Sequence, residues 1–406
     1  MNSGKRQVVL ISLITAACLL GDSMLYIVLP LHYSEVGLQS LWEVGVLLSV
    51  NRFVRLPLAP LVGWFYKTFR ARTGITIAVL LAAVTTFCYG LDYGFPFLLA
   101  ARCLWGVAWT LLRLGAFYLI IDLSDAGNRG YLMGTYNGLY RLGSLGGMLA
   151  GGLLADAYGL PFVATVFAAV SLVALPAAWL SVSEALGESA GREGAPAARA
   201  LTMRWNATWL KALGTGLLIA MVYQGIFTAT LSHLTEEAAG TIPIAGFVLG
   251  SAALAGILQA IRWGWEPLLA PWVGKQSDGR WGRDRLLGVS LLAGALLYAA
   301  LPLPMPLAVW LAVVLGVQLT ATVLTTVADT VATDLAAADG KSVMTTYSLA
   351  TDLGAALGPF LGYTVIEGFS TGTLYLGTAA VLLVMAVLWS PLARGRRVHY
   401  RQEQTP

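Results

Sequence analysis

Long apolar runs recur along the whole chain, and they constrain the fold more than any other feature of the sequence. A helix of about 20 consecutive apolar residues is long enough to cross a bilayer. Hydrophobic residues make up 57% of the chain and charged residues 11%, against about 25% charged in soluble domains, which excludes a soluble globular protein. The sequence therefore predicts twelve transmembrane helices, at 8–31, 40–65, 73–91, 95–121, 130–155, 160–182, 207–232, 243–273, 286–303, 306–333, 342–366 and 371–391.

Basic residues are distributed unevenly among the segments that connect these runs. With the N-terminus in the cytoplasm, 19 of the 25 lysines and arginines fall in cytoplasmic segments and none in external loops. An excess of Lys and Arg marks the cytoplasmic side of membrane proteins. We therefore expect a multi-pass protein of the plasma (inner) membrane with both termini in the cytoplasm.

The chain divides into two similar halves. A hydrophilic stretch rich in Ala, Gly, Ser, Glu and Arg separates them, which is typical of a linker. A shift of 211 residues aligns the Ala-Pro pair at 59–60 with that at 270–271, and Gly143 with Gly354. Parallel halves of this kind are typical of transporters whose substrate site lies between them at mid-membrane. The predicted domains are an N-terminal six-helix bundle (1–182), a cytoplasmic linker (183–206) and a C-terminal six-helix bundle with a cytoplasmic tail (207–406).

Several motifs resemble those of the major facilitator superfamily. The family's loop signature G-x-x-x-D-[RK]-x-G-[RK]-[RK] is similar to Gly274-Lys275-Gln276-Ser277-Asp278-Gly279-Arg280-Trp281-Gly282-Arg283, with one extra residue before Gly282. The first-half copy starts at Gly63 and has Lys67 in place of the aspartate. Arg102-Cys103-Leu104-Trp105-Gly106 looks like the R-x-x-x-G motif of the family's proton-coupled exporters. The resemblance covers essentially the whole chain and implies an all-α polytopic membrane protein with 12 transmembrane helices in two pseudo-symmetric six-helix bundles.

A glycine pattern in the fifth run resembles the antiporter signature G-x-x-x-G-P-x-x-G-G. It reads Gly143-x-x-x-Gly147-Met148-x-x-Gly151-Gly152, and its counterpart 211 residues later has the proline, Pro359. Small residues at this spacing let helix backbones approach closely, so the pattern serves either packing or switching. The residues assigned to the gate and to these motifs are Gly63, Lys67, Gly143, Gly147, Gly274, Asp278, Arg280, Gly282, Arg283, Gly358 and Pro359.

Ionisable residues inside the runs are functional candidates, because a charge within a membrane is costly unless it faces a partner or water. The N-terminal half has one deep acid, Asp22, against five arginines, so its interior is expected to be electropositive. Those arginines are Arg52, Arg55, Arg102, Arg113 and Arg141. In the C-terminal half, Arg262 and Glu266 are four residues apart and are expected to pair.

Asp22 and Arg102 are assigned to proton coupling. Burial disfavours the charged form of Asp22 and a nearby arginine favours it, so this charge can follow the opening of a cavity and carry a proton. The alternative is a fixed ion pair with Arg102 or Arg52. The assignment of Arg102 rests on its motif.

Arg113 and Arg141 are candidate substrate contacts, because a guanidinium matches the geometry of a carboxylate or phosphate. Structural ion pairs with Asp22 are the alternative. Asp352, at the position symmetric to Arg141, is expected to hold a cationic group. The remaining residues assigned to substrate binding are Arg52, Arg55, Tyr26, Asn137 and Gln318.

The leading functional hypothesis is a secondary active transporter working by alternating access, a proton-coupled exporter of small amphiphilic compounds with an anionic or zwitterionic group. Proton-coupled uptake of an organic anion is the alternative. A membrane-embedded enzyme is remote, since the sequence contains no H-E-x-x-H and no G-x-S-x-G.

Few features of the sequence indicate further binding partners. There is no P-loop, so an ion gradient rather than ATP is expected to supply the energy. The three cysteines lie inside apolar runs without a C-x-x-C, and no metal site or cofactor is indicated. The expected partners are a small-molecule substrate, protons and the lipid bilayer, with no nucleic acid, and the protein is expected to be a monomer.

Overall fold

The computed structural model describes residues 3–123, 129–181, 207–244, 247–278, 282–339 and 342–389. The predicted linker and cytoplasmic tail lie outside these ranges. The helices and strands, in chain order, are α1 (Ser3–His32), η1 (Tyr33–Val36), α2 (Leu41–Thr68), α3 (Ala71–Cys88), α4 (Gly94–Leu123), α5 (Arg129–Ser181), α7 (Ala207–Ile219), η4 (Ala220–Phe227), α8 (Thr228–Ala239), β1 (Ile242–Ile244), β2 (Phe247–Leu249), α9 (Ser251–Asp278), α10 (Arg283–Ala300), α11 (Leu307–Asp339), α12 (Ser342–Gly368) and α13 (Thr371–Trp389).

The prediction of a helical membrane protein with twelve helices is confirmed. Gly159, with a φ of 79°, divides α5 into two helices, and the π-helix η4 joins α7 to α8 in one continuous span. Nine described segments are long and apolar enough to cross a membrane, and one of them contains both helices of α5.

The predicted start of the eighth span, at residue 243, is wrong. Residues 242–244 and 247–249 pair as two short antiparallel strands, with Ile242 opposite Leu249, and α9 begins only at Ser251. Pro243 lacks the amide hydrogen that a helix interior needs, and Gly250 is a poor helix former, so the helix starts after both.

The start of α2 shows how local sequence sets a helix boundary. The hydroxyl of Ser40 accepts a hydrogen bond from the backbone N–H of Glu43 at 3.3 Å. The Glu43 carboxylate in turn accepts the backbone N–H of Gln39 at 2.7 Å. This arrangement closely resembles a capping box, in which side chains satisfy the free amide groups of the first turn.

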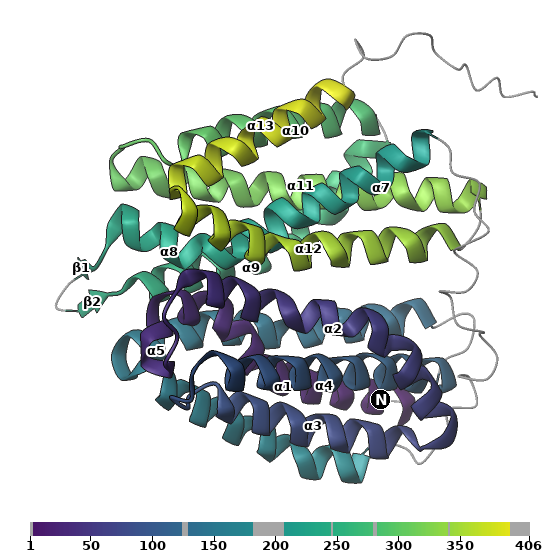
Figure 1. Cartoon of the computed structure of the whole chain (residues 1–406). Helices are drawn as coiled ribbons and strands as arrows, with labels where there is room; N and C mark the ends of the chain where they lie inside the picture. Colours follow the sequence, from purple (N-terminus) through teal and green to yellow (C-terminus); the bar gives the residue numbers. More distant parts are fainter. Residues whose placement is uncertain are drawn as a thin grey trace, which may run out of the picture.

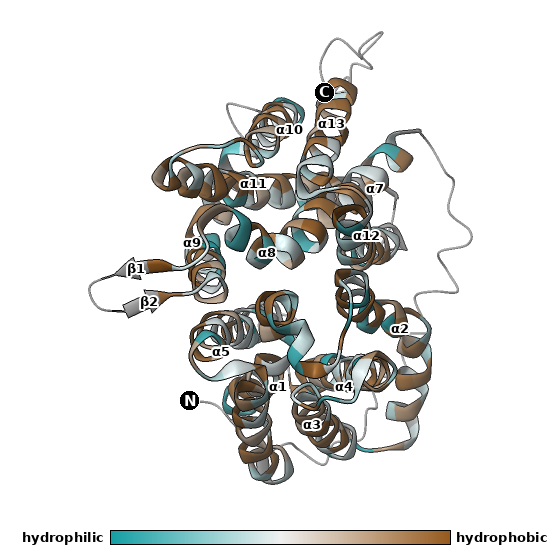
Figure 2. Cartoon of the chain, turned by 60° about the vertical axis from the view of Figure 1, so that its left-hand side comes forward, coloured by the Kyte–Doolittle hydropathy of each residue, from teal (hydrophilic) through white to brown (hydrophobic). Residues whose placement is uncertain are grey.

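The helices form two groups that lie side by side (Figure 1). Helices α1–α5 make one group, and η4 with α7–α13 makes the other. Large apolar side chains are exposed on the outside, including Trp64 (66%), Val173 (77%) and Leu268 (80%), and hydrophobic residues run along the helices of both groups (Figure 2). Such a surface suits contact with lipid rather than water.

The glycine pattern packs helices closely within each group. A Cβ atom added at Gly143 or Gly147 would overlap the backbone of α1, and one added at Gly354 would overlap the α7 backbone at Leu217. One added at Gly358 would overlap η4 at Gly225. The packing role is therefore present in both halves, in the corresponding helix pairs.

The two groups are in close contact at the end of the molecule that carries the β1–β2 hairpin, here called the hairpin end. The N–H of Trp42 donates to Glu367 at 2.6 Å, and the N–H of Ala253 donates to Asp156 at 2.8 Å. A Cβ at Gly152 would overlap the backbone of α9. The opposite end, where α1 begins, is called the N-terminal end (Figure 1).

Candidate functional site

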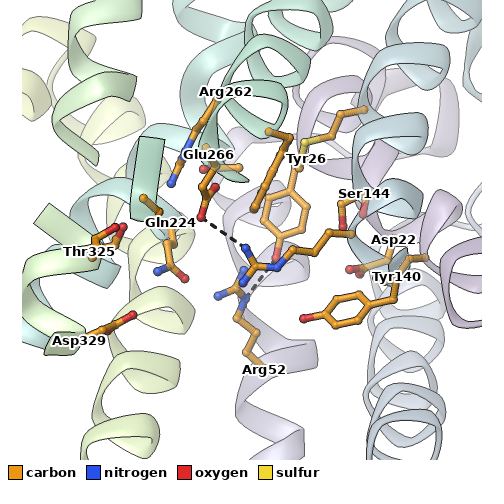
Figure 3. Close-up of a pocket in the computed structure, with 18 of the residues that line it drawn as sticks. Asp22, Tyr26, Arg52, Tyr140, Ser144, Gln224, Arg262, Glu266, Thr325 and Asp329 are labelled. Carbon is orange, nitrogen blue, oxygen red and sulfur yellow. Dashed lines mark hydrogen bonds and ion pairs between the residues drawn. The ribbon is translucent and has the colours of Figure 1, made fainter. Parts of the chain in front are cut away.

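A cavity of about 830 Å³, here called the central cavity, lies between the two groups. This is within the ~300–1,000 Å³ range of small-molecule sites. The groups meet at the hairpin end, and the lining reaches the first residue of α10 near the opposite end, so the cavity opens towards the N-terminal end. Five arginines and three carboxylates line it: Arg52, Arg55, Arg141, Arg262, Arg283, Asp22, Glu266 and Asp329 (Figure 3).

Asp22 forms a buried ion pair with Arg102. The carboxylate Oδ1 lies 2.5 Å from Nη1 of Arg102, and the two side chains are 9% and 1% exposed. Asn51 donates to the same oxygen at 3.2 Å, and Nε of Arg102 donates to the carbonyl of Leu47 at 2.8 Å. Asp22 lines the cavity while Arg102 lies behind it. The ion pair that the sequence offered as one alternative is present, with Arg102 rather than Arg52.

Arg52 and Arg55 are held mainly by aromatic side chains. Nε of Arg52 donates to the hydroxyl of Tyr26 at 3.3 Å (Figure 3). The guanidinium of Arg55 lies 5.2 Å from the ring centre of Trp109 and its buried Nε has no hydrogen-bond partner among the described residues. Both side chains thus remain cationic groups on the cavity wall with capacity for an anion.

Arg141 connects the two groups across the cavity. Its Nη1 lies 3.3 Å from Glu266 Oε1, and its guanidinium is 5.6 Å from the ring centre of Trp263 on α9. The expected pairing of Glu266 with Arg262 is therefore not the one seen. The carboxylate of Glu266 on α9 is paired with the guanidinium of Arg141 on α5 instead. Arg262 is 4% exposed and its Nε has no partner among the described residues.

A second cavity of about 320 Å³, here called the lateral cavity, lies between α5 and α9. It contains Asn137, a predicted substrate contact, and shares Arg141 and Glu266 with the central cavity. The structure thus places Tyr26, Arg52, Arg55 and Arg141 on the central cavity and Asn137 on the lateral one.

Three predicted substrate contacts line neither cavity. The guanidinium of Arg113 lies over Phe117 at 5.6 Å, and Asp352 is exposed on α12. Gln318 is fully buried, and its amide atoms have no hydrogen-bond partner among the described residues. Their role in binding stays a prediction that needs a different arrangement of the helices.

The loop-motif residues lie at helix ends near the opening of the cavity. Gly63 and Lys67 belong to the last turns of α2, and Gly274 and Asp278 to those of α9. Gly282 has a φ of 69° and precedes α10, whose first residue, Arg283, lines the central cavity. Arg280 lies outside the described residues.

Sequence reasoning did not single out Asn51, Trp263 or Gln259. Asn51 holds the Asp22 carboxylate, and Trp263 lines both cavities. Gln259 is fully buried one turn before Arg262, with no partner for its amide among the described residues. The available signal for Asn51 and Gln259 was a polar residue within an apolar run. In the described part of the chain, no three His, Cys, Asp or Glu side chains gather to hold a metal ion.

The chain matches the Major Facilitator Superfamily over residues 11–266 and 267–405. Multidrug resistance protein MdtG from Escherichia coli O6:K15:H31 (strain 536 / UPEC) is 25% identical over 388 residues, which cover 91% of this chain and 90% of that protein. The MdtG protein of Escherichia coli strain K12 / DH10B is 24% identical with the same coverage.

Solved structures of transporters share the fold at low sequence identity. The peptide transporter POT in complex with sulfate superposes with a TM-score of 0.75 at 12% identity, over 97% of this chain and 94% of that chain. The nucleoside transporter NupG gives 0.74 at 14% identity, over 98% and 100%. A bacterial homologue of the human lysosomal transporter Spinster, in an inward-facing and unoccupied conformation, gives 0.73 at 16% identity, over 96% of both chains. This chain therefore belongs to the major facilitator superfamily, as a multi-pass membrane transporter and not an enzyme.

Proposed function

We propose that this transporter exports small amphiphilic compounds carrying an anionic or zwitterionic group, in exchange for protons. The observation that carries the proposal is the charge of the central cavity, where five arginines face three carboxylates. An excess of cationic groups on the wall of a cavity at membrane depth favours an anion as the ligand. A carboxylate or phosphate of the substrate supplies that anion. The relatives named as multidrug resistance proteins support export of small molecules.

Asp22 is proposed as the proton carrier. Its carboxylate is on the cavity wall, where protons can reach it through water, and its charge is held by Arg102 and Asn51. Protonation removes the negative partner of a fully buried arginine, which favours a rearrangement of α1 against α2 and α4. In this way the charge on Asp22 couples to the packing of the N-terminal group.

Both termini are proposed to lie in the cytoplasm, so the N-terminal end of the molecule faces inward and the central cavity opens to the cytoplasm. With the native cysteines replaced, single cysteines introduced beside Glu35, Asp92 or Glu236 are expected to react with an impermeant reagent added outside. Cysteines beside Arg199 or Arg280 are expected not to react. External labelling at Arg199 would contradict this orientation.

The test of coupling is transport in proteoliposomes with the Asp22→Asn variant. A permanently neutral side chain mimics one protonation state, so transport driven by a pH gradient is expected to be abolished while exchange of labelled for unlabelled substrate continues. The wild type with the gradient collapsed is the matched control. Normal gradient-driven transport by a well-folded Asp22→Asn protein would rule out Asp22 as the carrier.

The substrate class is tested by thermal unfolding of the purified protein with added ligands. The probes are the anion butyl phosphate, the zwitterion phosphoethanolamine and the lipophilic cation tetraphenylphosphonium. Binding to the folded state alone raises the unfolding temperature. The anion and the zwitterion are expected to do so, whereas stabilisation by the cation alone would contradict the proposal.

A further inference from the structure

The contact between α5 and α9 changes along its length. Towards the hairpin end, a Cβ at Gly152 or Gly256 would overlap the backbone of the facing helix. Towards the N-terminal end, a Cβ at Gly138 or Gly274 would have nothing within 4 Å. The two helices therefore touch at one end and separate towards the other, and the lateral cavity occupies the separated part.

The lateral cavity faces the outer surface of the helix bundle. Its α5 wall includes Leu142 and Leu145, and Leu142 is 52% exposed. Leu153, eleven residues along the same helix and hence on the same face, is 45% exposed. That face carries exposed apolar side chains in a membrane protein, so it is the face in contact with lipid chains.

The two cavities share four lining residues, Arg141, Trp263, Glu266 and Ala270. These residues form the boundary between the outer surface and the central cavity. The boundary includes the Arg141–Glu266 ion pair, whose side chains are 48% and 21% exposed. An exposed ion pair contributes little to stability, so a competing anion can take its place.

We propose that the gap between α5 and α9 is a lateral site at which a single-chain amphiphile with an anionic headgroup enters from the bilayer. Its chain lies in the lateral cavity against Leu142 and Leu145, and its headgroup binds Arg141 in place of Glu266. Glu266 then remains beside Arg262, one turn away on α9. The preference for an anionic headgroup at Arg141 rests on the function proposed above.

The properties of the lateral cavity select this ligand. Its volume of about 320 Å³ is at the lower limit of small-molecule sites, which suits one chain rather than two. Its outer wall is apolar, and a cation lies at its inner end, which matches an apolar tail followed by a negative headgroup. A hydrophilic anion makes no favourable contact with the apolar wall of the lateral cavity, so it reaches Arg141 from the central cavity.

The experiment compares two probes with one headgroup, dodecyl phosphate and butyl phosphate, bound to the full chain in phosphatidylcholine nanodiscs. The variant Leu142→Trp fills the lateral cavity, and Leu153→Trp is its control on the same face outside both cavities. Referred to the free ligand in water, wild-type protein is expected to bind dodecyl phosphate at least about tenfold more tightly, because the longer chain concentrates this probe in the bilayer beside the lateral cavity. Leu142→Trp is expected to weaken dodecyl phosphate binding about tenfold and to leave butyl phosphate within twofold. Leu153→Trp is expected to change neither.

A second measurement places the chain directly. Dodecyl phosphate with a photoreactive diazirine at its chain end is expected to label Gly138, Leu142 or Leu145 of α5, which line the lateral cavity and not the central one. Labelling confined to the central cavity, around Tyr26 and Gln224, would overturn the lateral site, as would equal effects of Leu142→Trp and Leu153→Trp on dodecyl phosphate. If butyl phosphate fails to bind the wild type while the chain still labels α5, the function proposed above fails and the lateral site stands.

Discussion

The two ion pairs that face the central cavity differ in what they connect. Asp22 and Arg102 belong to α1 and α4 of the same group, and their side chains are only 9% and 1% exposed. Arg141 and Glu266 come from different groups and are 48% and 21% exposed. The first pair therefore holds one half of the transporter together, whereas the second holds the halves to each other.

Under the proposed function, this difference gives the two ion pairs separate tasks. Breaking a buried pair without replacing the charge is strongly unfavourable, so the Asp22–Arg102 pair can respond only when the carboxylate gains a proton. An exposed pair contributes little and is easily replaced by another anion. Under the proposed function, the buried Asp22–Arg102 pair responds to protons, and the Arg141–Glu266 pair, here called the bridging pair, responds to substrate.

The largest effect is expected when the buried pair is broken from the arginine side. Arg102→Met leaves the Asp22 carboxylate buried without its cation, which lowers the free energy of unfolding by about 3–5 kcal/mol. Unfolding of the purified protein, followed by heat or denaturant, measures this loss. The double variant Asp22→Asn/Arg102→Met removes both charges and is expected to recover part of it. A single variant as stable as the wild type would show that the pair carries no structural role.

A smaller effect is expected on ligand binding when the bridging arginine is changed. Arg141→Ala removes hydrogen bonds to a charged ligand, worth about 1.5–3 kcal/mol, so butyl phosphate binding should weaken roughly tenfold to a hundredfold. The butyl phosphate affinity of Arg141→Lys is expected to lie between those of the wild type and Arg141→Ala, because an ammonium cannot make a bidentate contact.

Arg113→Ala is the matched comparison for this measurement. Arg113 lies outside both cavities in this structure, so its replacement is expected to leave binding by this conformation nearly unchanged. Equal losses for Arg113→Ala and Arg141→Ala would favour the original sequence assignment and a site formed by a different helix arrangement. Unchanged binding in both variants would indicate that both arginines have structural roles only.

The helices and their grouping could be predicted from the sequence because they follow from single, strong signals. Apolar length predicted the spans, including one that starts at residue 40, and the structure shows Ser40 and Glu43 capping the start of α2 there. The glycine repeat correctly indicated close packing at Gly143 and Gly354. The error at residue 243 arose because an apolar stretch with Pro243 satisfies hydropathy without satisfying helix hydrogen bonding.

The site was harder to predict because it depends on which helices face each other. Helical phase places Arg52 and Arg55, three residues apart, on one face of α2, and both line the central cavity. It also suggested a local pair between Arg262 and Glu266, whereas the carboxylate is held by Arg141, 125 residues earlier in the chain. Single-helix patterns cannot decide between a neighbour on the same helix and a partner on another. The π-helix η4, which turns Gln224 into the cavity, has no clear sequence signal either.

The smallest effect on stability is expected when the bridging pair is broken from the carboxylate side. Glu266→Gln removes an exposed ion pair, so the free energy of unfolding should change by no more than about 1 kcal/mol. The same change frees the Arg141 guanidinium, so butyl phosphate binding should become several-fold tighter. Because the negative charge of Glu266 no longer competes, this binding should also become more sensitive to added salt. The matched control is Glu367→Gln, because Glu367 also connects the two groups, at Trp42, but lies outside both cavities.

Glu367→Gln is expected to leave anion affinity unchanged, since its contact is to a backbone amide and frees no cation. Two results would contradict the assignment of separate tasks to the two pairs. A loss of stability in Glu266→Gln as large as that in Arg102→Met would mean that the bridging pair is structural. Weaker anion binding in Glu266→Gln would mean that the carboxylate positions Arg141 for the ligand rather than competing with it, and the bridging pair would then be part of the binding site in its intact form.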